Sequence, residues 1–267
     1  HQHRGLAGDT QLGAGRGANV DVAVRSSATA EDLPGASFAG EQETYLGIRG
    51  AKQLLIATKA TMASLFTARA ISYRTDKGFD HTKIALSVGV EIMVHSGEGA
   101  SGVMFTLDTE SGFKDSIVIN GSWGLGEMIV QGQVSPDEYL VAKQLLGKAP
   151  KPIIFKKLGE KADKMIYTKN MLGIRPLKIV KTTEEERQNF VLSDSEILTL
   201  ATWGQMIEDH YTAKHGKWTP MDTEWAKDGK TGELFIVQAR PETIHAERDF
   251  SKLKEYVLSE PLDSARG

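Results

Sequence analysis

Two β-prone runs near the end of the chain decide the fold: Met221–Ala226 (MDTEWA) and Leu234–Arg240 (LFIVQAR). Between them lies Asp228–Gly232 (DGKTG), a five-residue loop with two glycines, which predicts a β-hairpin. With a loop of that length, Lys227 faces Glu233 as an opposite-charge cross-strand pair, which supports the register.

Strand parity then divides the hairpin into two faces. The register places Trp225 opposite Phe235 and Asp222 opposite Gln238. Because side chains alternate between faces with a period of two, one face carries four polar residues: Asp222, Glu224, Gln238 and Arg240. The other face carries three apolar residues and is expected to join the core: Trp225, Phe235 and Val237.

The polar face of the hairpin suits a hard divalent cation beside phosphate groups. Carboxylate and amide oxygens are ligands that Mg²⁺ accepts, usually together with water and nucleotide phosphates. Arginine offers fixed donors that match phosphate oxygens. An ordinary solvent-exposed face of an antiparallel sheet is the alternative interpretation.

A second stretch, far upstream, favours the phosphate interpretation. Residues 26–40 (SSATAEDLPGASFAG) follow a predicted strand that begins at Val20 and ends at Arg25. Small residues and hydroxyls let backbone N–H groups approach phosphate oxygens closely. An ordinary surface loop has a similar composition, and the segment is not the Gly-rich P-loop pattern. Arg25 at the strand end favours a phosphate contact.

Composition excludes several classes of partner. The chain has 267 residues, a formal net charge of -3 and no cysteine. It therefore carries no disulfide or thiolate chemistry, and its charge predicts neither a nucleic-acid nor an anionic-membrane surface. We expect no nucleic-acid or membrane partner and a cytoplasmic protein, since no run is long enough to span a bilayer.

The remaining pattern predicts a mixed α+β fold. Residues 50–76 are expected to form one helix whose apolar stripe joins the core: Leu55, Met62, Leu65, Phe66 and Tyr73. Residues 83–94 predict a strand that carries Glu91, either as a ligand contact or, as the sequence favours, on the exposed side of an edge strand. Four further strands are expected over residues 101–106, 116–120, 137–141 and 152–155.

Two segments complete this pattern. Residues 157–188 are rich in lysine and predict surface hairpins with an irregular connection, their charges forming a solvated face. Ser193 and Glu196 form a capping-box signature that opens a helix reaching about His215.

Several long segments, in order, resemble the nucleotide-binding domain of the phosphoenolpyruvate synthase (pyruvate, water dikinase) family. The first is residues 25–40, RSSATAEDLPGASFAG, and the last is residues 236–243, IVQARPET. Between them lie SLFTARA at 64–70, GVMFTLDT at 102–109 and GLGE at 124–127. Pyruvate phosphate dikinase and rifampicin phosphotransferase share this domain, but residues 106–109 and 239–243 are more similar to the synthase.

The resemblance implies an ATP-grasp fold of the pyruvate phosphate dikinase N-terminal type, in which two α+β lobes hold Mg-ATP between antiparallel sheets. It implies that Arg25, Gly40 and Thr44 lie on the phosphate side of ATP. Glu224 and Gln238 would hold Mg²⁺, and Arg240 would contact the transferred phosphoryl group. Asp222 shares that face and ranks behind Glu224 as a ligand. Arg25 and Arg240 would be the catalytic residues.

The resemblance also sets the expected domain boundaries. It covers residues 18–245, preceded by a mobile arm at 1–17 and followed by a linker at 246–267 that leads toward an absent phosphohistidine domain. The opening segment of the family domain, with its Gly-Gly-Lys phosphate lysine, is absent. Glu91 stands where members of the family have glutamine beside the adenine, which bears on nucleotide preference.

The function that the resemblance implies belongs to a longer protein. In it, a phosphohistidine domain and a pyruvate-binding domain would be the partners, and a homodimer is one assembly consistent with the family. ATP would phosphorylate a histidine and then pyruvate, giving phosphoenolpyruvate, AMP and phosphate, while this fragment alone would not complete the turnover. Three alternatives stay open: a related phosphotransferase acting on a small molecule such as an antibiotic, a binding module that transfers nothing, and a structural domain without a ligand.

Overall fold

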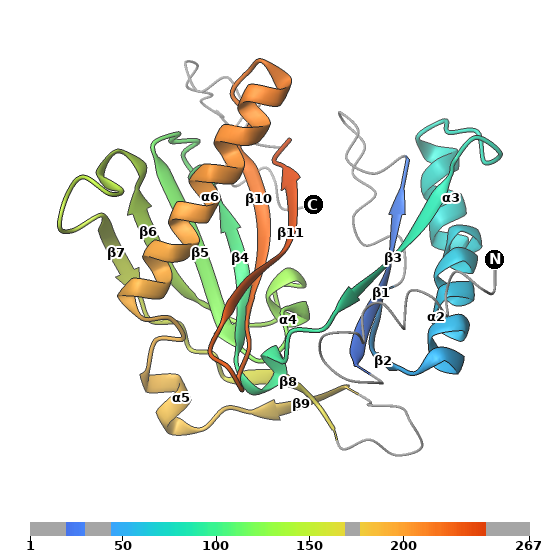
Figure 1. Ribbon diagram of the computed structural model, residues 1–267, viewed down its shortest axis with the longest axis horizontal. Coiled ribbons are helices and arrows are strands. Elements are labelled where there is room, and N and C mark those ends of the chain that lie inside the picture. The colour runs from blue at the N-terminus through green and yellow to red at the C-terminus, as the bar shows by residue number, and fades with distance from the viewer. Residues whose placement is uncertain (1–19, 30–43, 169–176, 244–267) are drawn as a thin grey trace, which may run out of the picture.

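The structure is a computed structural model, and it describes residues 20–29, 44–168 and 177–243. The arm predicted at 1–17, the linker predicted at 246–267 and Gly40 lie outside the described residues. The described chain forms a three-stranded, a six-stranded and a two-stranded sheet, with helices beside the two larger ones. The predicted mixture of helix and sheet is confirmed (Figure 1).

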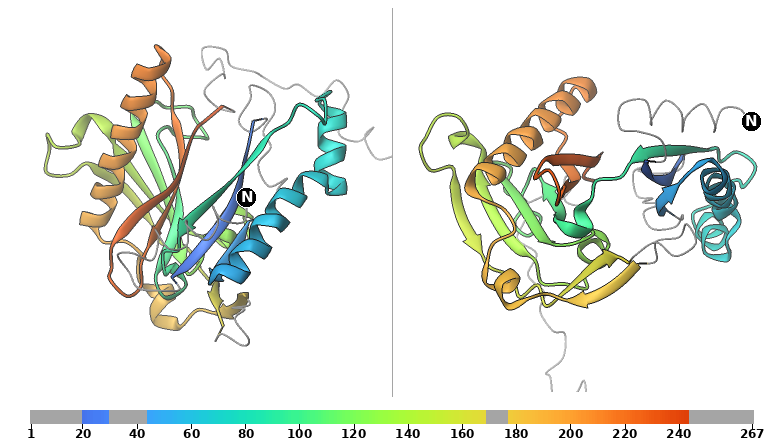
Figure 2. Two further views of the ribbon diagram at one scale, coloured as in Figure 1. Left: turned by 45° about the vertical axis from the view of Figure 1, so that its right-hand side comes forward. Right: turned by 60° about the horizontal axis from the view of Figure 1, so that its bottom comes forward.

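The smaller lobe is built on an antiparallel sheet in the order β2-β1-β3. Its strands are β1 (Asp21–Ala28), β2 (Tyr45–Arg49) and β3 (Leu86–Ile92). The helices α2 (Ala51–Ala63) and α3 (Ala68–Asp76) lie on the side of this sheet that faces away from the larger one, as both views in Figure 2 show. The strand predicted to end at Arg25 continues to Ala28, pairing with β3 along that whole length.

The helix predicted over residues 50–76 is interrupted. A short 3-10 turn, η1 (Ser64–Phe66), follows α2, and the extended Thr67 then caps α3 by accepting a hydrogen bond from the Ala70 N–H. The predicted apolar stripe is wrong at two of its five residues: Phe66 in the 3-10 turn is 69% exposed, and Met62 near the end of α2 is 50% exposed. Leu55, Leu65 and Tyr73 are partly buried. The buried contacts of α2 come from Leu54 and Ala57, which pack against β1.

The larger lobe is an antiparallel sheet in the order β11-β10-β4-β5-β6-β7. Its strands are β4 (Ala100–Phe105), β5 (Ser116–Trp123), β6 (Asp137–Ala142), β7 (Ile153–Lys157), β10 (Met221–Lys227) and β11 (Leu234–Pro241). The long helix α6 (Asp194–His215) crosses one face, as Figure 1 shows, and buries Ile197 and Leu200 there. The predicted capping box is confirmed at Ser193 and Glu196.

Trp225 explains why two glycines lie in the middle of this sheet. The Trp225 side chain is 1% exposed. A Cβ atom at Gly102 would lie 2.7 Å from the indole ring, and one at Gly121 would lie 2.9 Å from it. Glycine on two neighbouring strands therefore makes the space in which the largest side chain of the core packs.

Residues 157–168 and 177–188 form a smaller unit beside the larger sheet. β8 (Asp163–Tyr167) and β9 (Leu177–Lys181) pair as a two-stranded sheet, and α5 (Glu184–Gln188) follows with its own capping box. The short helix α4 (Glu127–Val130) and the 3-10 turn η3 (Lys143–Leu145) complete the larger lobe. The predicted hairpin is present, but α5 was not predicted.

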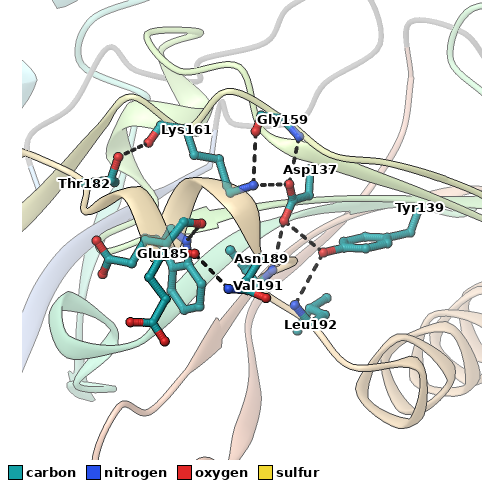
Figure 3. A network of polar contacts seen from close by, with 11 residues as sticks. Asp137, Tyr139, Gly159, Lys161, Thr182, Glu185, Asn189, Val191 and Leu192 are labelled. Carbon is teal, nitrogen blue, oxygen red and sulfur yellow. Dashed lines mark hydrogen bonds and ion pairs between the residues drawn. The ribbon is translucent and has the colours of Figure 1, made fainter.

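One lysine of that segment contradicts the prediction of a solvated face. Lys161 is completely buried, and its ammonium group is paired with Asp137 at the start of β6 (Figure 3). Asp137 also accepts hydrogen bonds from the Gly159 N–H at 2.8 Å, the Val191 N–H at 2.9 Å and the Tyr139 hydroxyl at 3.1 Å. The backbone of Lys161 has φ 44°, a region that favours glycine, and the buried ion pair offsets the cost of that conformation.

This network ties three segments together. Burial, together with the neighbouring Asp137 carboxylate, raises the pKa of Tyr139, whose hydroxyl accepts from the Leu192 N–H at 3.3 Å. Asp137 therefore connects β6, the segment before β8 and the segment before α6. Its partners are mostly far away in the sequence, which is why composition alone suggested solvated charges.

The hydropathy of the helices bears on membrane insertion for the described residues only. No single helix is both long enough and apolar enough to cross a bilayer. The bent pair Ala51–Phe66 and Ala68–Asp76 meets that test when the two are taken together, on length and composition only.

Candidate functional site

The predicted hairpin is present, with an irregular register. Asp222 pairs with Arg240 and Glu224 pairs with Gln238, but the pairing shifts before Trp225, which lies opposite Ile236. Val237 is therefore an extra residue on β11, a β-bulge. The polar face is confirmed, because both polar pairs lie on the Glu224 side of this bulge.

The predicted cross-strand pairs are wrong, because a longer loop displaces the register by one residue and the bulge displaces it by a second. Lys227 lies opposite Leu234 rather than Glu233, so the loop has one residue more than predicted. Asp222 lies opposite Arg240 rather than Gln238, and Trp225 opposite Ile236 rather than Phe235. Beyond the bulge the parity of β11 reverses, so the core partners of Trp225 are Ile236 and Leu234 instead of Phe235 and Val237.

Arg240 is held by its cross-strand neighbour. Its Nε donates to Asp222 Oδ2 at 2.8 Å, and its Nη2 lies 2.7 Å from the same oxygen. Both side chains are partly buried, so the guanidinium is fixed in orientation and partly withdrawn from water. Asp222 thus orients Arg240, a role that the opposite charges on one face could have indicated.

Arg25 reaches the same face from the smaller lobe. Its guanidinium donates to Gln238 Oε1 and, at 3.5 Å, to the carbonyl oxygen of Val237 at the bulge. It also lies 3.7 Å from the Glu91 carboxylate. β3 is an edge strand and the Glu91 side chain is 48% exposed, as the edge-strand interpretation predicted. The structure therefore brings Arg25, Glu91 and Gln238 together from two sheets.

Glu224 is the carboxylate at the centre of this face. Burial raises its pKa above the ordinary value of a glutamate; Arg25 and Arg240 oppose that shift, and Asp222 and Glu91 add to it. Within the described parts of the chain, no hydrogen bond or ion pair of the Glu224 carboxylate is found. A half-buried carboxylate between two arginines, with neither as a direct partner, is available to a cation.

Thr44, another predicted site residue, has no described contact with the polar face of the hairpin. Thr44 lies exposed immediately before β2, and among the described contacts no hydrogen bond joins it to the hairpin face. The surface hollows at residues 111–115 and at residues 150–156, the latter also lined by Asp194 and Leu198, include none of the site residues. Sequence reasoning missed the bulge at Val237, for which the alternating pattern of LFIVQAR gives no signal.

Comparison with known proteins identifies the family. Residues 9–259 match the family described as pyruvate phosphate dikinase, AMP/ATP-binding domain. The chain is 59% identical over 247 residues to phosphoenolpyruvate synthase of Aquifex aeolicus (strain VF5), covering 92% of this chain and 28% of that protein. It is 55% identical over 241 residues to phosphoenolpyruvate synthase of Synechocystis sp. (strain ATCC 27184 / PCC 6803 / Kazusa), covering 90% of this chain and 29% of that protein.

A third relative is phosphoenolpyruvate synthase of Escherichia coli (strain K12), 50% identical over 228 residues, with 85% of this chain and 28% of that protein covered. The chain spans less than a third of the length of these curated relatives. Because the family match extends over nearly the whole chain, the chain belongs to the family of pyruvate phosphate dikinase AMP/ATP-binding domains.

Proposed function

We propose that this chain is an ATP-grasp domain that holds Mg-ATP between its smaller and larger sheets. The observation that carries the proposal is the meeting of Arg25 from β1 with the polar face of β10 and β11, where Glu224 stands without a direct partner among the described residues. Two arginines and a carboxylate at one point match what a metal-bound polyphosphate requires. The family match supports the same ligand.

Magnesium would be held by Glu224 and Gln238. Among the described residues, no group of three or more acidic, histidine or cysteine side chains could hold a metal by itself. The pair of oxygens from Glu224 and Gln238 fits Mg²⁺, which usually takes one or two protein oxygens and completes its shell with phosphate oxygens and water. Bound there, the ion would neutralise charge on the phosphates.

Arg25 and Arg240 would bind the phosphates. Arg25 donates a hydrogen bond to the Gln238 amide oxygen in this structure. The negative charge of a polyphosphate would attract Arg25 and leave the Gln238 oxygen available to the metal. Arg240, oriented by Asp222, would meet the phosphoryl group that is transferred. Gly40 and Thr44 would line the phosphate side, and Glu91 the adenine side.

In a longer protein, we propose that this domain supplies the phosphoryl group for making phosphoenolpyruvate from pyruvate. ATP, pyruvate and water would give phosphoenolpyruvate, AMP and phosphate through a phosphohistidine on a separate domain. The names of the relatives support this reaction.

Calorimetric titration of the chain with ATP, with and without Mg²⁺, tests the binding site. We expect Mg²⁺ to strengthen ATP binding, and Glu224→Gln to remove roughly tenfold or more of the affinity for Mg-ATP, because a metal ligand is lost. Glu233→Gln, an exposed carboxylate in the loop of the same hairpin, is the matched control and should bind as the wild type does. Equal Mg-ATP affinity for wild type and Glu224→Gln would refute the metal site.

The raised pKa of Glu224 gives a second expected result. Metal binding needs the ionised carboxylate, so Mg²⁺-dependent affinity should begin to fall at a higher pH than a glutamate with the ordinary pKa of 4.5 would allow. Without ligand, the pH dependence of the stability has the opposite sign: ionisation of Glu224 lowers the free energy of unfolding. The fold favours the protonated form, and this contribution to stability is full below the unfolded pKa and lost as pH rises through the folded pKa. Glu224→Gln should therefore raise the free energy of unfolding at neutral pH in urea titrations, and a lower value would contradict the assigned burial.

A further inference from the structure

The segment that joins the two sheets, residues 93–99, is packed tightly against the loop of the hairpin. A Cβ atom at Gly229 would lie 2.2 Å from the backbone of Glu98, and one at Gly99 would lie 2.3 Å from the Lys227 carbonyl oxygen. Two glycines are thus required where two backbones meet. The end of the segment at Glu98 and Gly99 is therefore packed as part of the larger lobe.

His95 fastens the segment to that loop. Its backbone N–H donates to Asp228 Oδ2 at 3.2 Å, and its carbonyl oxygen accepts from the Gly229 N–H at 3.2 Å. Its ring Nδ1 lies 3.1 Å from the same Asp228 oxygen. The other ring nitrogen, Nε2, points to the smaller lobe, where it lies 3.9 Å from Asp21 Oδ2 on β1.

The proton positions follow from the carboxylates on either side. Burial alone would raise the pKa of Asp228, yet hydrogen bonds from the Lys230, His95 and Thr231 groups lower it to about 2. Asp228 is therefore ionised and can only accept, which places a proton on Nδ1 of His95. A neutral imidazole then has a bare Nε2 facing the Asp21 carboxylate, whereas an imidazolium has an N–H there.

Arg49 on β2 is a further charge that faces this pair. It binds both oxygens of Asp21, with Nε to Oδ1 at 2.8 Å and Nη2 to Oδ2 at 2.7 Å. Arg49 therefore weakens the attraction between Asp21 and His95 without cancelling it, because Asp228 adds a second negative charge on the other side of the ring. Asp21 and Asp228 are both nearly inaccessible to solvent, so water screens the cluster incompletely.

The cluster bears on the site through β1. Asp21 and Arg25 lie four residues apart on one face of that strand, about 13 Å by the rise of a strand. Asp228 and Gln238 belong to the same hairpin of the opposite lobe. A change in the His95–Asp21 contact would therefore act on the strand that carries Arg25.

We propose that His95 is a positioning residue of the nucleotide site, whose imidazolium links Asp228 of the larger lobe to Asp21 of the smaller lobe and draws Arg25 onto the hairpin face. Loss of the ring proton leaves His95 attached to Asp228 and releases Asp21. The consequence for ATP rests on the proposed function, while the movement of the lobes does not.

The absence of cysteine makes the movement measurable, because two introduced cysteines label uniquely. Lys59 on α2 and Met206 on α6 are exposed, one on each lobe. Spin labels at these positions report the interlobe distance by pulsed electron resonance, without nucleotide, at about pH 5.5 and about pH 8.5, on either side of the range in which histidines titrate. We expect a shorter, narrower distance distribution at the lower pH, and a distribution that no longer responds to pH in His95→Gln.

His210→Gln on α6, an exposed histidine outside the cluster, is the matched control and should keep the wild-type response. Identical wild-type distributions at the two pH values would overturn the proposal, and this comparison needs no variant to fold. In calorimetry, His95→Gln should bind Mg-ATP roughly two- to fivefold more weakly than wild type at the lower pH and equally at the higher pH. A pH-dependent distance in a chain that does not bind ATP would support the link between the lobes and refute the proposed function instead.

Discussion

Replacing Arg240 by alanine should lower phosphoryl transfer by about a thousandfold or more in the longer protein that we propose. An arginine at the transferred group offsets charge that develops in the transition state, and a preorganised donor does so without reorganisation. Asp222 supplies that preorganisation through the 2.8 Å hydrogen bond to Arg240 Nε. The measurement is the rate of AMP formation from ATP and pyruvate.

The control for this loss is Arg187→Ala on α5. Arg187 forms a similar pair with Glu184 at 2.6 Å on the solvent side of the molecule, outside the hairpin face. The Arg187→Ala variant should leave the rate of AMP formation unchanged. Turnover of Arg240→Ala within tenfold of wild type, with the fold intact by circular dichroism, would show that Arg240 does not contact the transferred group.

Asp137→Ala should lower the free energy of unfolding by about 3–5 kcal/mol, because it leaves the ammonium group of Lys161 buried without its counter-charge. Three further donors lose their acceptor in the same variant: the Gly159 and Val191 N–H groups and the Tyr139 hydroxyl. Urea denaturation followed by circular dichroism measures the loss. For a domain that is stable by about 5–15 kcal/mol, such a loss removes a large fraction of the total.

Lys181→Ala is the matched control, since Lys181 pairs with Asp163 at 3.0 Å but is 77% exposed. It should change the stability by less than about 0.5 kcal/mol, as exposed ion pairs do. Combining Asp137→Leu with Lys161→Met should recover part of the stability, because no buried charge then remains. A loss below about 1 kcal/mol in Asp137→Ala would mean that water reaches Lys161, so that the polar groups of the network in Figure 3 are solvated rather than buried.

The hairpin shows how far strand parity can be trusted. The alternation of polar and apolar residues predicts correctly that Asp222, Glu224, Gln238 and Arg240 share a face. It fails beyond Val237, because a bulge reverses the parity of the strand and leaves no mark in composition. The polar face of the hairpin was predictable, since its four residues lie entirely on one side of that irregularity.

Two other predictions failed for reasons of context. A continuous helical period over residues 50–76 does not reveal that Thr67 prefers to cap a new helix, and the break exposes Phe66. A lysine-rich segment suggests solvated charges, yet Lys161 finds Asp137, a partner 24 residues away in the sequence. The first deciding contact is a local cap between Thr67 and Ala70, and the second is a tertiary ion pair. Hydrophobic periodicity carries no information about either.

The bulge at Val237 has an effect outside the site. β11 is the outermost strand of the larger sheet, and a continuous outer strand presents a row of free peptide groups on which another molecule can add a strand. The bulge interrupts that row of peptide groups, and the Val237 carbonyl oxygen accepts a hydrogen bond from Arg25. The irregularity that places Gln238 opposite Glu224 therefore also protects the chain against edge-to-edge aggregation.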